Sequence, residues 1–176
     1  DWYRSRGLGD VYKRQAILIA LGLVLIYITF RFQWRQGIAA IITLLHDVMV
    51  VVGIFSIFDK EFTLPVIAAL LTVVGYSLND TIVIFDRIRE NISKFRKREL
   101  LPLINQSVTE TLSRTLLTSG TTLMVVLALV FLGGEIIHDF AFALLVGVLI
   151  GTYSSIYVAS PTVLWLTKIA PPKTSD

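Results

Sequence analysis

Four ionisable side chains interrupt apolar segments of this 176-residue sequence, and their types are suited to proton chemistry. They are His46, Asp47, Asp80 and Arg114. A charged group at the centre of a bilayer costs about 2.5 to 3.5 kcal/mol on insertion scales, so each of them needs a reason to be there. An aspartate or a histidine can bind and release a proton when its surroundings change, and an arginine can balance the resulting charge.

Asp80 has the strongest functional character of the four. It lies in the polar run from Ser77 to Thr81, with Asn79 beside it. At a rise of about 1.5 Å per residue it is about 9 Å short of Asp86, where the apolar segment ends. A short carboxylate at that depth is protonated, paired or in contact with water, and a change between these states is what proton coupling requires. The alternative is a structural carboxylate fixed by hydrogen bonds between helices.

Arg114 stands near the start of the next apolar segment, in the run from Thr111 to Thr115. Its side chain is long enough to reach toward the depth of Asp80, so we expect the two residues to form the proton site. The alternative is an arginine that extends to the lipid headgroups, which is common near a helix end.

The adjacent pair His46 and Asp47 is predicted to support this site. Neighbours on a helix point about 100° apart, so the two cannot both face one partner helix squarely. A histidine suits proton relay, although a satisfied core histidine is an alternative. His138 and Asp139 are placed where water is close, either as an entry route or as a solvated helix cap.

Other kinds of chemistry find no support in the sequence. There is no cysteine and there are only two histidines, which argues against a metal centre. No phosphate-binding loop or nucleophile with a base is present, so we expect no enzyme activity, no cofactor, and an energy source other than bound nucleotide. The net charge of +3 does not indicate nucleic-acid binding, because the basic residues lie at the ends of apolar runs.

The composition predicts an all-α polytopic membrane protein. Hydrophobic residues make up 55% of the sequence, charged residues 16%, and the mean hydropathy is +0.73. A spanning helix needs about 20 mostly apolar residues. Five segments meet this requirement, and we group them as one transmembrane domain over residues 16–167: 16–34, 37–58, 64–85, 111–132 and 137–166. In the last, Gly147 and Gly151 favour close helix packing, and Ser160-Pro161 predicts a kink.

Lys and Arg residues predict the orientation of these helices. Most of them fall in the loop 31–37, the loop 86–110 and the tail 168–176, which places those segments in the cytoplasm. Within 88–104 apolar residues recur at helical spacing among basic ones, and Pro102 is expected to end or kink such a helix. We therefore expect an amphipathic helix on anionic headgroups, the alternative being a solvated charge run that only sets topology.

Residues 1–15 fit this arrangement poorly. They carry four basic residues on the side predicted to be outside. We interpret much of this segment as foreign or misassembled sequence, with a genuine outer segment as the alternative, and we leave it out of the fold prediction.

The run from Leu64 to Asn91, with its Tyr-Ser-Leu-Asn-Asp-Thr core, resembles the fourth membrane helix of the SecF family and the exit from that helix. The stretches 44–47 and 111–118 match other parts of the family, so the resemblance covers essentially residues 16–167. The sister SecD family has a related helix without the Tyr-Ser-Leu-Asn-Asp pattern. The resemblance implies five helices of a six-helix half bundle of the resistance-nodulation-division (RND) superfamily, beginning at the second helix.

The resemblance also implies a function in the bacterial inner membrane. Members of the family pair with SecD, join the SecYEG channel and the SecA motor, and use the proton motive force to help translocate polypeptide substrates. Asp80 and Arg114 match the family's intramembrane aspartate and arginine, with a further aspartate supplied by SecD. Two alternatives stay open: another proton-driven exporter half of the same superfamily, and a structural assembly subunit whose buried charges only fix packing.

Overall fold

The chain folds into long helices joined by short turns. A computed structural model describes residues 2–95 and 99–169, without the side chains of residues 2–10 and 13. The helices are α1 (Trp2–Arg31), α2 (Trp34–Ile57), α3 (Leu64–Lys94), α4 (Leu100–Leu132), α5 (Gly134–Ser154), the π-helix η1 (Ser155–Ala159) and α6 (Ser160–Ile169). No strand occurs in the described residues, so the predicted all-α class is confirmed.

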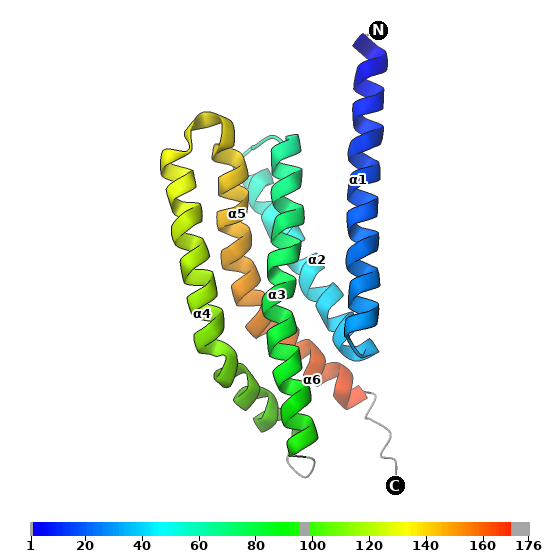
Figure 1. Ribbon diagram of the computed structural model, residues 1–176, viewed down its shortest axis with the longest axis vertical. Helices are drawn as coiled ribbons and strands as arrows, with labels where there is room; N and C mark the ends of the chain where they lie inside the picture. Colours follow the sequence, from blue (N-terminus) through cyan, green and yellow to red (C-terminus); the bar gives the residue numbers. More distant parts are fainter. Residues whose placement is uncertain (1, 96–98, 170–176) are drawn as a thin grey trace.

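Five helical stretches are long and apolar enough to cross a membrane, as predicted. The fifth is continuous over Gly134–Ile169 and consists of α5, η1 and α6. The kink predicted at Ser160-Pro161 is present as the π-helix before it, and Figure 1 shows α6 running at an angle to α5. The fourth stretch is longer than a bilayer requires, so the first turns of α4 extend beyond the apolar core.

Helix α3 is the central element of the bundle. It packs against α2, α4 and α5, while α1 stands beside the bundle in Figure 1. Only 6% of the spanning part of α1 is buried, against 44% for α3. Most of the core that positions polar side chains is therefore built around α3.

The described contacts of α1 with the bundle lie near its C-terminal end. The guanidinium of Arg31 pairs with the carboxylate of Asp86 on α3. The ring of Phe32 meets the ring of Phe85 edge to face at 5.5 Å between centroids. The side-chain amide of Gln36 donates to the carbonyl of Phe85 at 3.2 Å. These contacts join the turn between α1 and α2 to the end of α3.

The predicted interfacial helix over 88–104 is wrong as a separate element. Residues up to Lys94 continue α3, and α4 already begins at Leu100. The apolar residues Ile88 and Ile104 are buried in the bundle core rather than facing lipid headgroups. The helical spacing was therefore real, but it belongs to the ends of two long helices that pack against each other. Residues 96–98 and 170–176, including most of the predicted tail, lie outside the described residues.

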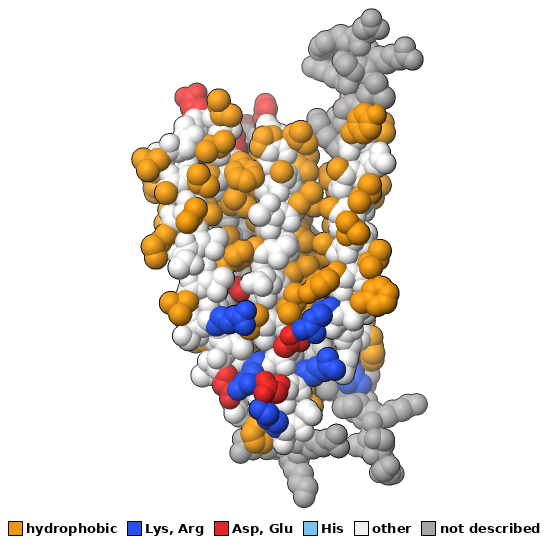
Figure 2. All heavy atoms as spheres, viewed as in Figure 1, with side chains coloured by type: hydrophobic (Ala, Val, Ile, Leu, Met, Phe, Trp, Pro, Cys, Tyr) orange, Lys and Arg blue, Asp and Glu red, His pale blue; other side chains and the backbone are white. Residues whose placement is uncertain are grey.

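Charged side chains gather at one end of the bundle. Figure 2 shows Lys, Arg, Asp and Glu side chains over the lower ends of α3 and α4, with hydrophobic side chains above them. We call this the charged end, defined by the described residues of 86–110, and it is the end predicted to be cytoplasmic. The opposite end carries the α2–α3 and α4–α5 turns.

Close packing of α3 against α5 depends on two glycines. A Cβ at Gly147 would lie 2.0 Å from Cγ2 of Val73, and a Cβ at Gly151 would lie 3.2 Å from Cβ of Ser77. The predicted small-residue face is therefore confirmed, and it sets α3 and α5 in parallel, with 73 level with 147 and 77 level with 151.

We predict that Gly147→Ala lowers the free energy of unfolding by about 1 to 3 kcal/mol, because the new methyl group overlaps a fully buried valine. Gly53→Ala is the matched control, since a Cβ there has nothing within 4 Å. Denaturation in detergent micelles measures both. Equal stability of the two variants would contradict the close approach, and Val73→Ala should restore part of the loss.

Candidate functional site

The carboxyl group of Asp80 lies between three helices. Its side chain is 3% exposed, and the hydroxyl of Ser119 on α4 is 3.5 Å from Oδ2. Ser119 also exchanges a hydrogen bond of 2.7 Å with Thr152 on α5 and receives one of 3.3 Å from the Tyr76 hydroxyl. Because 3.5 Å is long for a hydrogen bond, Asp80 is only weakly bound by its polar neighbours. We call Asp80, Ser119, Thr152 and Tyr76 the Asp80 cluster.

Arg114 does not form an ion pair with Asp80 in the contacts of the described residues. Arg114 and Asn79 are exposed on the bundle surface, whereas Asp80 is buried. The pairing that the sequence makes plausible is therefore not among the described contacts.

A cleft of about 500 Å³ extends along α3 and α4 on the exposed side of this pair. Its lining is rich in polar and charged groups and runs from the depth of Asp80 to the charged end: Asn79, Ile82, Val83, Asp86, Arg87, Glu90, Glu110, Thr111 and Arg114. The cleft is large enough for several water molecules. The cleft surrounds Arg114 with polar groups. Its lining residues Asn79 and Arg114 are each followed in the sequence by a buried polar residue, Asp80 on α3 and Thr115 on α4.

Sequence reasoning missed Glu110, which fastens α4 to α3 at the charged end. Its carboxylate accepts hydrogen bonds from Asn91 at 3.0 Å, Gln106 at 2.8 Å and Arg87 at 2.5 Å. These donors, led by the Asn91 amide, lower the pKa of Glu110 to about 2. Glu110 lies on the part of α4 beyond the apolar core and stays charged at any physiological pH, so it is an anchor rather than a proton carrier.

Asp47 is the most completely buried carboxyl group of the described bundle, with no exposed surface. The hydroxyl of Ser77 on α3 donates to it at 2.5 Å, and Nδ1 of His46 lies 3.1 Å from its other oxygen. Asp47 therefore faces α3, while the partly exposed His46 ring contacts it from the side. The pair is separate from the Asp80 cluster, but Ser77 is nearly one helical turn from Asp80 on the same helix.

Thr81, which the sequence placed in the site, is buried but does not contact Asp80 in any described hydrogen bond. Its hydroxyl and that of Thr115, the neighbour of Arg114, have no hydrogen-bond partner in the structure. Both side chains are 1% exposed. Unpaired hydroxyl groups at this depth are uncommon, because burying a polar group without a partner is unfavourable.

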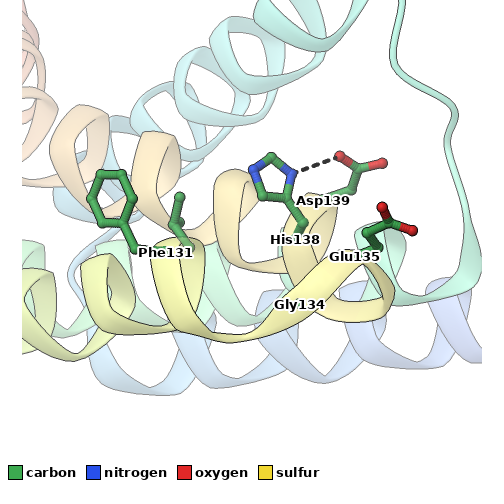
Figure 3. A pocket seen from close by; sticks show the side chains of 6 residues that line it. Phe131, Gly134, Glu135, His138 and Asp139 are labelled. Carbon is green, nitrogen blue, oxygen red and sulfur yellow. Dashed lines mark hydrogen bonds and ion pairs between the residues drawn. The ribbon is translucent and has the colours of Figure 1, made fainter.

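The opposite end has a smaller polar group. Figure 3 shows His138 and Asp139 joined above the α4–α5 turn, with Glu135 beside them. Lys60 donates to Asp139 at 2.5 Å and so ties the α2–α3 turn to α5. An open pocket of about 420 Å³ lies against these residues. This arrangement fits the solvated cap, one of the two readings of the sequence.

Among residues 2–95 and 99–169, no three His, Cys, Asp or Glu side chains come together as metal ligands. The cofactor-free reading of the sequence stays a prediction, since no observation of the structure tests it.

Residues 11–169 match the family described as protein export membrane protein SecD/SecF, C-terminal. The chain belongs to the SecD/SecF family. Similarity to curated relatives agrees: the chain is 57% identical over 151 residues to the protein translocase subunit SecF of Vibrio alginolyticus, covering 86% of this chain and 48% of that protein. It is 51% identical over 160 residues to the SecDF subunit of Thermus thermophilus, covering 89% and 22%.

The fold of the family matches as well. The crystal structure of SecDF, a translocon-associated membrane protein from Thermus thermophilus, superposes with a TM-score of 0.84 at 51% identity, over 89% of this chain and 22% of that chain. The super-membrane-facing form of SecDF gives 0.80 at 52% identity, over 88% and 21%. The chain spans about half the length of the SecF relative named above. It is a multi-pass membrane domain of the bacterial inner membrane.

We predict that Ser77→Ala lowers the free energy of unfolding by about 1 to 3 kcal/mol, because the buried Asp47 carboxyl loses its hydroxyl donor. Ser154→Ala serves as the control. That hydroxyl is equally buried but donates only to the Gly151 carbonyl of its own helix. Denaturation in detergent micelles compares the two, and a loss no larger for Ser77→Ala than for Ser154→Ala would show that the Asp47 contact adds nothing.

Proposed function

We propose that this chain is the membrane part of a SecF-type accessory subunit of the Sec translocase. Together with SecD it uses the proton motive force to promote protein translocation across the cytoplasmic membrane. Membership of the SecD/SecF family and identities above 50% to translocase subunits support this function. The proton-driven mechanism is supported by the site.

The main support for the mechanism is that the buried carboxyl group of Asp80 accepts only a weak hydrogen bond from its neighbours. Asp80 is 3% exposed, the hydrogen bond described for its carboxyl is the 3.5 Å contact from the Ser119 hydroxyl, and no ion pair involves it among the described residues. A carboxyl held this way has no strong partner that fixes one protonation state. Asp47, by contrast, accepts a hydrogen bond of 2.5 Å and fits a structural role.

Arg114 supplies the second part of the mechanism. When Asp80 is ionised, the guanidinium at the edge of the cleft balances its charge; when Asp80 is protonated, Arg114 turns to water and to the carboxylates of the cleft. Each elementary charge that crosses a potential of 100 mV releases about 2.3 kcal/mol. Repeated protonation of Asp80 therefore supplies energy for a movement of the attached parts. Asn79, which lines the cleft, and Thr81 assist the site.

The partners follow from the family. The matched Thermus thermophilus relative is named SecDF, which supports SecD as the companion of this chain. SecYEG, SecA, the translocating polypeptide and membrane lipids complete the proposed surroundings, with no nucleic acid. The proposed subunit has no cofactor and no enzyme activity of its own, since the proton gradient supplies the energy.

We predict that Asp80→Asn, in the full-length protein assembled with SecD, lowers proton flux about tenfold or more, because an amide cannot carry the proton. Proton-dependent export should fall with it. A pH-sensitive dye in membrane vesicles measures the flux, and co-purification with SecD measures assembly. Asp59→Asn is the control, because it removes a carboxylate from an exposed turn whose positive φ of 51° asparagine also adopts.

Full proton flux and full export with Asp80→Asn would overturn the mechanism. Loss of SecD binding with unchanged flux per assembled complex would instead assign Asp80 to assembly.

A further inference from the structure

The unpaired hydroxyl groups of Thr81 and Thr115 stand out against the other threonines of the spanning helices. A helical threonine usually satisfies its hydroxyl by donating to the carbonyl four residues earlier. Thr43 does so to Ala39 at 2.8 Å, and Thr152 does so to Val148 at 2.7 Å. Thr81 and Thr115, which are about as deeply buried as Thr43, make no such bond, so their hydroxyl groups are free to bind something else.

The helix contacts place both threonines at the same level. Helix α3 runs parallel to α5, with Ser77 against Gly151, so Thr81 is level with Ser155 one turn further on. Helix α4 runs antiparallel to α5, with Ser119 bonded to Thr152, so Thr115 is level with Ile156. Both hydroxyl groups therefore lie at the level where α5 ends and η1 begins.

The π-helix adds hydrogen-bond acceptors at that level. Its widened turn breaks the regular bonding of the helix, and π segments of this kind occur often at functional sites. An α-helix would direct the N–H of residue 161 to the carbonyl of Tyr157, but Pro161 has no N–H. The Tyr157 carbonyl therefore lacks the backbone donor that an α-helix would give it. Unpaired hydroxyl groups and a carbonyl without this donor thus occur close to one depth of the bundle.

We propose that Thr81 and Thr115 bind water against η1, and that this water connects the Asp80 cluster with the cleft at the charged end. Water in a protein interior needs a polar site with two to four partners, which these groups supply. Thr111, Thr115 and Ser119 follow one another at intervals of one turn on α4, and they lead from the cleft wall to the Asp80 cluster.

The role of this water in proton transfer rests on the proposed function, whereas the water site itself does not. A proton that leaves Asp80 binds the nearest water, and that water releases another proton to the next one, so one proton reaches the cleft. The threonine hydroxyls only hold the water in place. Asp80 is left as a carboxylate, and no other reactant takes part.

Cysteine labelling tests the water site directly, because these 176 residues contain no cysteine, and any cysteine in the rest of the full-length protein or in SecD is first replaced by serine. Thr81→Cys and Thr115→Cys are prepared singly in the full-length protein assembled with SecD and exposed at the charged end to the small cationic thiol reagent aminoethyl methanethiosulfonate. Val163→Cys is the control. It is buried, surrounded by the apolar core, and nearer the charged end than either threonine, so distance favours the control.

We expect both threonine positions to react about tenfold faster than Val163→Cys, because only a hydrated thiol ionises and reacts readily. Labelling no faster than at Val163 would overturn the water site, whatever the result for Asp80.

Valine substitution tests the function of the water. Thr81→Val and Thr115→Val keep the shape and remove the hydroxyl, and we expect proton flux to fall severalfold while SecD binding is kept. Serine at the same positions should restore the flux. Thr43→Val is the matched control, since that buried hydroxyl is already satisfied by Ala39.

Unchanged flux in both valine variants, in a complex whose flux still depends on Asp80, would remove the water link and leave the proposed function intact. If Asp80→Asn also left the flux unchanged, the proposed function would fail instead.

Discussion

Inside a lipid bilayer every polar group must find its partner within the protein, and this constraint governs how the five helices pack. Buried polar side chains occur on α3 and on helices that pack against it, such as Asp47 on α2 and Ser119 on α4. Gly147 and Gly151 let α5 approach α3 closely enough for Ser77 to pack against Gly151. The close packing of the helices therefore also brings their buried polar side chains near one another.

The same constraint separates two carboxyl groups that look alike in sequence. Asp47 is enclosed and strongly bonded to Ser77, which leaves it little freedom. Asp80 is enclosed but weakly bonded, with a single long hydrogen bond from Ser119 among the described contacts. Asp47 and Asp80 thus differ in how strongly neighbouring groups hydrogen-bond to their carboxyl groups. Glu110 shows a third condition, an acid at the edge of the bundle whose several donors lower its pKa enough to keep it charged at physiological pH.

Much of this could be predicted from the sequence. The five spans, the all-α class, the small-residue face and the kink before Pro161 follow from local patterns, and they are confirmed. The depth of Asp80 followed from counting residues. The separate helix over 88–104 was wrong, because periodicity cannot tell an interfacial helix from the packed ends of two long ones. The anchor at Glu110 and the unpaired hydroxyls of Thr81 and Thr115 depend on which helix faces which, and such information lies in the packing rather than in any local pattern.

The attachment of α1 has a mechanical consequence. Helix α1 has 30 residues and is about 45 Å long, its described contacts with the bundle lie near Arg31, and only 6% of its stretch Arg14–Arg31 is buried. When a rigid helix is held at one end, a change of its tilt moves the far end more than the held end. A small shift near Ile28 would therefore move the distant turns of α1 through a larger distance. Arg31 binds Asp86, which is also part of the cleft wall. The Asp86 carboxylate therefore belongs both to the wall of the polar cleft and to the attachment of α1 to the bundle.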